Sequence, residues 1–320
     1  DHADFPASES YLRRALAADP HFARARAYLA VTQAALPLIG IGPLDSLNME
    51  VRRNADEALA VDSTVVEAYI AESNALSNDL RLAEALTPLE RGMAIDRNQP
   101  NLLLFYAQAL AAVGRMPEAL AAARQAHERD PLSVSAWAIY GYYLAMSGRV
   151  DEGLAQMQGA LALDPNQPIS QRAVGYWFAF DGHPDSALAH LQRSFALDSS
   201  TYGGRSNLVF GYASTGRWAD AERERARFAR NRRSTSGNYE RATVELAFGE
   251  YDNAMTSLER SVQAREPLLW IPSLPCDPLF DPLKANPRFD LLMKRLGAKA
   301  CAPRLQWPIA RPPRRQPSSD

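Results

Sequence analysis

The sequence predicts an all-α solenoid of about seven antiparallel helix pairs that ends in a short C-terminal cap. Three residue types carry this prediction, because each recurs with a period of 34 residues. The aspartates are Asp62, Asp96, Asp130, Asp164 and Asp198, and the glycines are Gly114, Gly148, Gly182 and Gly216. The small residues, which lie five positions after the glycine position of each unit, are Ala85, Ala119, Gly153, Ala187 and Ala221. A fixed period of this length indicates stacked repeats, each of them one supersecondary unit.

Composition excludes several other classes of protein. The chain has 320 residues and a formal net charge of -2, which argues against a nucleic-acid-binding protein with its usual basic excess. No apolar run approaches the roughly 18 residues that a membrane helix needs. With only Cys276 and Cys301, the chain is neither a disulfide-dense scaffold nor a four-cysteine zinc protein.

The chemistry of one unit predicts how its two helices begin, end and cross. Asp130 precedes Pro131, which predicts an N-cap acceptor followed by proline at the first helical position. Gly148 is expected to end the first helix in a left-handed conformation. Gly141 in the first helix and Gly153 in the second are expected to face each other where the two helices cross closely.

This pattern resembles the tetratricopeptide repeat. The best copy of its signature consists of Trp137, Tyr140, Gly141, Leu144, Gly153, Ala160 and Pro165. The resemblance covers roughly residues 3–266. It implies a right-handed superhelix whose first helices line a concave surface, and a protein that binds other proteins or peptides there.

The repeats divide the chain into three parts. Residues 1–266 form the array, with a leading half repeat and units that start near residues 23, 66, 100, 134, 168, 202 and 235. Residues 267–297 are expected to cap the last repeat, which would otherwise expose its apolar face. Residues 298–320, rich in proline and arginine, are predicted to be a disordered tail. The half repeat at the start predicts that the chain was cut from a longer protein.

Two segments depart from the period inside the array. The units that start near residues 23 and 66 are nine residues further apart than the period, and the extra length falls around residues 37–44. We interpret this segment as a loop on the end of the array; an apolar lip for a ligand is the alternative. Residues 217–233 hold seven arginines with acidic residues at helical spacing, which indicates a solvated, ion-paired helix face. A patch for an acidic partner is the other interpretation of that segment.

The end of the chain carries a second resemblance. Two Asp-Pro pairs, a Pro-Arg-Phe and a leucine-rich helix ending in Leu-Gly make up residues 277–297. This ending is similar to the closing segment of tetratricopeptide regions in bacterial signalling proteins, where it follows a serine/threonine kinase, an adenylate cyclase or a winged-helix domain. The resemblance implies an output domain upstream of this chain.

The sequence offers no constellation for catalysis. It has no Walker A motif, HExxH, nucleophile elbow or kinase catalytic loop. We therefore expect no enzyme, cofactor or metal site within these residues. Cys276 and Cys301 either form a disulfide that closes the cap or are two unrelated thiols.

The concave side of the first helices is the predicted binding surface. Helical spacing places a row of aromatic, methionine and amide side chains on it, with one cation. The candidate residues are Asn74, Asn78, Gln108, Tyr142, Met146, Arg172, Tyr176, Phe180, Asn207 and Phe210. Such a surface suits an extended peptide or a docked helix, although the aromatic residues could instead pack against the next repeat. Because the surface has no further cations, we expect the segment that binds there to be neutral or apolar, or to be an intramolecular element of the parent protein.

The functional prediction is a non-catalytic scaffold that binds a peptide or protein segment, as the sensing or assembly region of a bacterial signalling protein. One alternative is the regulatory region of a kinase or cyclase whose catalytic domain lies upstream. The other is a stand-alone exported assembly factor. We expect no nucleic-acid partner. A cytoplasmic location is slightly favoured over an extracytoplasmic one, which would require an upstream anchor.

Overall fold

The computed structural model describes residues 5–39, 41–199, 204–230, 237–266 and 274–309, and these ranges contain helices and connecting segments without a strand. The α-helices are α1 (Phe5–Ala18), α2 (Ala23–Ala35), α3 (Leu44–Val61), α4 (Val66–Asn78), α5 (Leu86–Ile95), α6 (Pro100–Ala112), α7 (Met116–Arg129), α8 (Val134–Met146), α9 (Val150–Leu163), α10 (Pro168–Phe180), α11 (Pro184–Leu197), α12 (Gly204–Ser214), α13 (Trp218–Arg230), α14 (Gly237–Ala247), α15 (Tyr251–Gln263) and α16 (Pro287–Arg295). Two 3-10 helices are η1 (Leu36–Ile39) and η3 (Pro278–Leu283).

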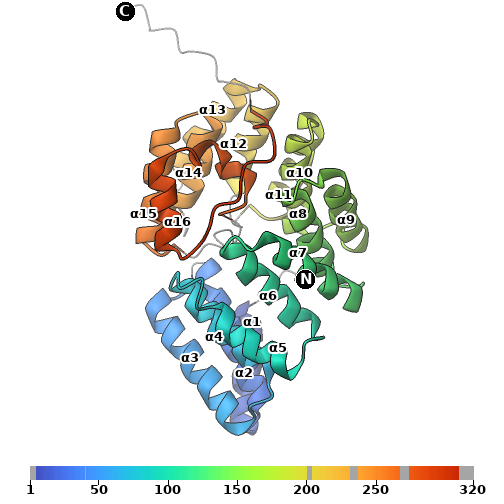
Figure 1. Cartoon of the computed structure of the whole chain (residues 1–320), viewed down its shortest axis with the longest axis vertical. Helices are drawn as coiled ribbons and strands as arrows, with labels where there is room; N and C mark the ends of the chain where they lie inside the picture. The colour runs from blue at the N-terminus through green and yellow to red at the C-terminus, as the bar shows by residue number, and fades with distance from the viewer. Residues whose placement is uncertain (1–4, 40, 200–203, 231–236, 267–273, 310–320) are drawn as a thin grey trace, which may run out of the picture.

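The helices confirm the predicted all-α solenoid. Each pair from α2–α3 to α14–α15 is antiparallel, α1 precedes the pairs, and α16 follows them (Figure 1). The first helices of neighbouring pairs contact each other, as α8 does α10 and α10 does α12. The first helices therefore form the inner layer of the superhelix, from which a binding surface would be built.

The aspartates of the repeat end helices, so the expectation that Asp130 is an N-cap is wrong. Asp130 is the C-cap of α7, and α8 instead begins after Ser133, whose hydroxyl accepts from the Ala136 amide at 3.2 Å. In the equivalent turn, the Asp164 carboxylate accepts from the Asn166 amide at 3.0 Å. The aspartate thus shapes the reversal between two units, and the next cap comes three residues later because the chain needs that length to turn.

The glycines behave as the pattern predicts. Gly148 has a φ of +89°, in the left-handed region where a side chain is strained. At the crossing of α8 and α9, a Cβ on Gly141 would lie 2.6 Å from the carbonyl oxygen of Gly153, and one on Gly153 would lie 2.5 Å from that of Gly141. The two backbones therefore touch, which only glycine allows at this separation.

The array curls until its end meets its beginning. Arg265, just after α15, donates to Asp45 in α3 at 2.7 Å, although 220 positions separate the two residues. The same guanidinium donates to Asp79, which follows α4, at 3.4 Å. The inner surface of the superhelix is therefore closed on the side where these elements meet.

The C-terminal cap covers the last repeat and continues into the groove. Phe289, Leu292 and Met293 of α16 are buried. After α16, residues 298–309 run back between the two halves of the array (Figure 1), with Trp307 packed against the main core and Ile309 buried. The expectation of a disordered tail is wrong for residues 298–309, because their apolar side chains find a partner surface inside the superhelix. Residues 310–320 lie outside the described part of the chain.

The two segments that break the period have ordinary structural roles. The insertion after α2 forms η1 and a turn at Gly42, with Leu36 buried; residue 40 lies outside the described ranges. Arg217, just before α13, pairs with Asp220 at 2.7 Å, and within α13 Arg227 pairs with Glu224 at 2.6 Å. These pairs agree with an ion-paired helix face, and the arginines at 232 and 233 lie outside the described residues.

Candidate functional site

The inner surface carries a continuous row of aromatic side chains. Tyr142 of α8 and Tyr176 of α10 stack with ring centroids 6.3 Å apart, and Tyr176 stacks on Phe210 of α12 at 5.5 Å. Phe180, one turn along α10, lies 5.0 Å from Tyr176 and 6.2 Å from Phe210. Four of the predicted residues from three successive repeats therefore form one aromatic surface, as their spacing on the first helices requires.

The middle of this surface is occupied by Asp277, a residue the sequence analysis did not single out. Its carboxylate accepts from the hydroxyl of Tyr142 at 3.0 Å and from that of Tyr176. It also accepts from the Leu279 amide at 2.9 Å and so caps η3. Asp277 is only 4% exposed, and each of these donors offsets part of the cost of burying its charge.

Burial dominates the electrostatics around Asp277. Burial raises the pKa of the Asp277 carboxyl above its ordinary value, although the hydrogen bonds from Tyr176, Leu279 and Tyr142 act in the opposite direction. Burial, and then the nearby Asp277 carboxylate, raise the pKa of the Tyr142 and Tyr176 hydroxyls well above the usual value. Burial also lowers the pKa of the Arg172 guanidinium to about 10.

A small polar cavity remains between the cap and the aromatic row. It has a volume of about 50 Å³, and Arg172, Tyr176, Asn207, Tyr239, Glu240 and Asp277 are among the residues that line it. A space of this size holds a few water molecules, since one water needs roughly 10–15 Å³ of such volume. The cavity is therefore too small for a peptide while η3 is in place.

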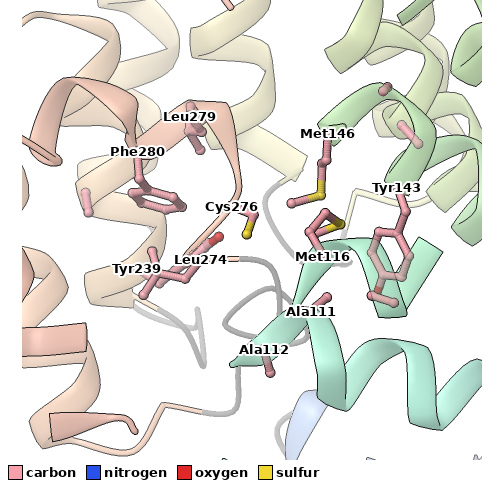
Figure 2. Close-up of a cluster of buried hydrophobic side chains, with 14 of the residues drawn as sticks. Ala111, Ala112, Met116, Tyr143, Met146, Tyr239, Leu274, Cys276, Leu279 and Phe280 are labelled. Carbon is pink, nitrogen blue, oxygen red and sulfur yellow. The ribbon is translucent and has the colours of Figure 1, made fainter. Parts of the chain in front are cut away.

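A disulfide joins the two parts of the C-terminal region that enter the groove. Cys276, just before η3, is bonded to Cys301, and their Cα atoms are 4.7 Å apart. The Cys301 amide also donates to the Pro275 carbonyl at 2.8 Å. Figure 2 shows Cys276 between Phe280 and Tyr239 on one side and Met116 and Met146 on the other. Of the two interpretations of the cysteines, the structure has the disulfide.

The remaining predicted residues differ in their surroundings. Met146 is 5% exposed and belongs to the cluster around Cys276, and Asn207 lines the polar cavity. Asn78 lies at the other end of the array, where its amide donates to the Ala34 carbonyl and to the Asn48 side chain, both at 3.2 Å. Asn74 and Gln108 are half-buried. The structure thus brings seven of the ten around the C-terminal region, and Asn78 joins a separate polar contact.

Two further features bear on function. Within the described ranges, no helix combines the length and apolar character needed to cross a bilayer. The same ranges bring no three or more His, Cys, Asp or Glu side chains together as a possible metal site.

Comparison with known proteins places the repeats in a family. Residues 106–168 match the sequence profile described as tetratricopeptide repeat. Residues 106–168 carry tetratricopeptide repeats. No curated protein sequence matches the chain.

One solved structure aligns over most of this chain at low sequence identity, and two others align less well. A chain of the APC/C hetero-tetramer Cut9-Hcn1 aligns with a TM-score of 0.60 and 15% identity, over 84% of this chain and 51% of that one. PilF of Pseudomonas aeruginosa gives a TM-score of 0.47 and 16% identity, over 63% and 92%. YrrB, a TPR protein with an unusual peptide-binding site, gives a TM-score of 0.40 and 19% identity, over 59% and 92%. At these identities the tetratricopeptide likeness concerns the fold alone.

Proposed function

We propose that this tetratricopeptide array is a non-catalytic scaffold that binds an extended segment of a protein partner along its concave side. The observation that carries the proposal is the position of Trp307, which we call its seat: the centroid of its ring lies 6.2 Å from that of Phe180 and 6.3 Å from that of Phe210. An extended stretch of chain already lies on this surface and places an aromatic anchor there. Large rings in partly enclosed seats are the residues that usually dominate binding energy in protein interfaces.

We further propose that the array serves as the sensing or assembly part of a larger bacterial signalling protein. Support comes from the segment 277–297, which is similar to the closing segment of such regions and here forms η3 and α16. Because each repeat contacts mainly its neighbours, a partner that changes the curvature at one end would move the other end.

Site-specific crosslinking tests the scaffold proposal. A photoreactive phenylalanine analogue would replace Phe180 on the concave side, or Leu132 in the exposed loop after α7, which is 78% exposed. Each variant would be made in cells with the native Trp307 and with Trp307→Ala, which clears the seat on Phe180. We expect a distinct partner protein to be captured from position 180 when Trp307 is replaced, and not from position 132. Capture from position 132 alone would contradict a concave binding surface.

A specific observation favours a second candidate, the exported assembly factor. The Cys276–Cys301 disulfide is typical of proteins in oxidising compartments and rare in the cytosol. Acid trapping of cells, followed by alkylation before and after reduction, would measure whether the two thiols are bonded in the living cell. Two free thiols under all growth conditions would remove the support for this candidate.

A further inference from the structure

Residues 298–309, which we call the strap, cross successive repeats one at a time. The Lys299 amide donates to the carbonyl of Val113, at the end of α6, at 3.1 Å. The Arg304 guanidinium donates to the carbonyl of Ser147, at the end of α8, at 2.8 Å. Trp307 then reaches Phe180 at the end of α10 and Phe210 in α12. Each contact falls on the next repeat along the array.

These contacts are of the kind that a separate peptide could make. The last carbonyls of a helix have no partner within the helix, so they accept from any donor that the strap presents. The same helix end carries a partial negative charge, which favours a cation such as Arg304 at Ser147. The strap forms no helix or strand, and Lys299, Ala302, Pro303, Arg304 and Gln306 are exposed. Its position therefore depends on contacts with the repeats and on the disulfide at Cys301.

One glycine of the repeat has an additional role under the strap. A Cβ on Gly114 would lie 2.0 Å from the carbonyl oxygen of Lys299. Gly182 and Gly216 occupy the same position in later repeats, also with positive φ, and have nothing within 4 Å of such a Cβ. All three glycines end a helix with a positive φ. Among the three, only Gly114 also leaves space for the Lys299 carbonyl of the strap. This difference supplies a matched pair of variants.

We propose that the strap is a built-in competitor, and that the groove it occupies binds a partner segment with an arginine three residues before a tryptophan. The inference rests on the proposed scaffold function and adds the partner's chemistry and its regulation. Arginine would bind the Ser147 carbonyl, and tryptophan would enter the seat between Phe180 and Phe210. The Cys276–Cys301 bond raises the effective concentration of the strap at this site, which weakens binding of any partner in solution.

The test uses the full chain with a weakened strap. The release variant carries Cys276→Ser, Cys301→Ser and Trp307→Ala, which leave Val113, Ser147, Phe180 and Phe210 unchanged. The probe is a fluorescein-labelled synthetic peptide of residues 298–309 with serine in place of Cys301. By fluorescence anisotropy we expect the peptide to bind the release variant at least tenfold more tightly than the wild-type chain. Replacing Arg304 or Trp307 of the peptide by alanine should weaken binding at least tenfold.

Several outcomes would overturn the proposal. A release variant that is folded by circular dichroism but does not bind the peptide, or binds the tryptophan-free peptide equally well, excludes the assigned specificity. A wild-type chain that is dimeric and dissociates on addition of the peptide assigns the groove to a second copy instead of a partner. If crosslinking from position 180 captures a protein while the peptide fails to bind, the scaffold function stands and this inference alone is wrong.

A second measurement covers the case in which the release variant does not fold. Gly114→Ala and Gly182→Ala impose the same positive-φ strain, but only the first places a methyl group against the strap. Hydrogen exchange should become at least tenfold faster at the Lys299 and Cys301 amides in Gly114→Ala and stay unchanged in Gly182→Ala. Equal exchange in the two variants would mean that the strap does not depend on this seat, and would overturn the proposal.

Discussion

The Tyr142 hydroxyl donates to the Asp277 carboxylate at 3.0 Å across 135 positions of sequence. Tyr142 belongs to the inner row of the array, and Asp277 begins the 3-10 helix of the cap. A second donor, the hydroxyl of Tyr176, reaches the same carboxylate from the next repeat. The cap is therefore held by hydrogen bonds to a buried charge as well as by apolar packing.

The first prediction concerns the pH dependence contributed by Asp277. Because its pKa in the folded protein is raised above 3.8, the folded state binds this proton more tightly than the unfolded state does. Its contribution to stability is therefore fully present below about pH 3.8 and is lost as pH rises through the raised value. Urea unfolding across this range should show the stability of the wild type falling relative to Asp277→Asn, then levelling off.

Tyr142→Phe provides the control for this prediction. It removes a donor that lowers the Asp277 pKa, so the interval over which stability is lost should extend to higher pH. A difference between wild type and Asp277→Asn that is constant with pH would contradict the assigned cause.

The second prediction concerns the helix crossing at Gly141. A methyl group there meets the Gly153 carbonyl oxygen at 2.6 Å and the Met157 side chain at 2.8 Å, so α8 and α9 must move apart. We expect Gly141→Ala to lower the free energy of unfolding by about 1–3 kcal/mol, as overpacked cores do. Gly237→Ala, at the start of α14 with nothing within 4 Å, is the matched control and should be near neutral. Equal effects in chemical denaturation would mean that the crossing is not tight.

The third prediction concerns the disulfide. Cys276 and Cys301 are separated by 25 positions, and a loop of this length constrains the unfolded chain by about 3.5 kcal/mol in the chain-entropy model. The variant Cys276→Ser/Cys301→Ser should lose about that amount in urea unfolding. Adding a thiol reductant should destabilise the wild type by a similar amount and leave the variant unchanged; sensitivity of the variant to reductant would contradict the assignment.

The fourth prediction compares two ion pairs of the same spacing. Glu224 pairs with Arg227 and also with Arg205 from α12, and its side chain is only 9% exposed. Glu118 pairs with Arg115 and is 54% exposed. Glu224→Gln should cost about 1–3 kcal/mol because it removes a buried carboxylate that accepts from both Arg205 and Arg227. Glu118→Gln should cost less than about 0.5 kcal/mol, since exposed pairs contribute little; similar values from thermal unfolding would show that burial does not decide the difference.

The repeat pattern was sufficient to predict the helices, because it reflects contacts within one unit and between neighbours. Gly148 ends a helix, as Gly114, Gly182 and Gly216 do in their own units, and Gly141 marks the crossing of the two helices of one unit. The aspartate was misplaced because Asp followed by Pro suits both a helix start and a turn, and the choice depends on how many residues the chain needs to reverse.

The sequence predicts the residues of the array that form the candidate surface, but it does not predict which residues of the C-terminal region lie against them. Tyr142, Tyr176, Phe180 and Phe210 follow from spacing on the first helices, which is a local property. Asp277 and Trp307 lie in segments without a period, so no pattern connected them to those rings. Tyr142 and Tyr176 are 135 and 101 positions from Asp277, and Trp307 is similarly far from its aromatic partners, so only the folded superhelix brings these residues into contact.

The sequence by itself determined the repeat, the helix pairs and the aromatic character of the inner face, because each depends on residues at most a few tens of positions apart. Tertiary structure decided that the array closes through Arg265 and Asp45 and that the strap lies in the groove. Closure accumulates from small rotations between successive repeats, which no single unit encodes. The strap contacts residues of the array that are about 100 or more positions away in the sequence, such as Ser147 and Phe180, so no local pattern predicts its position.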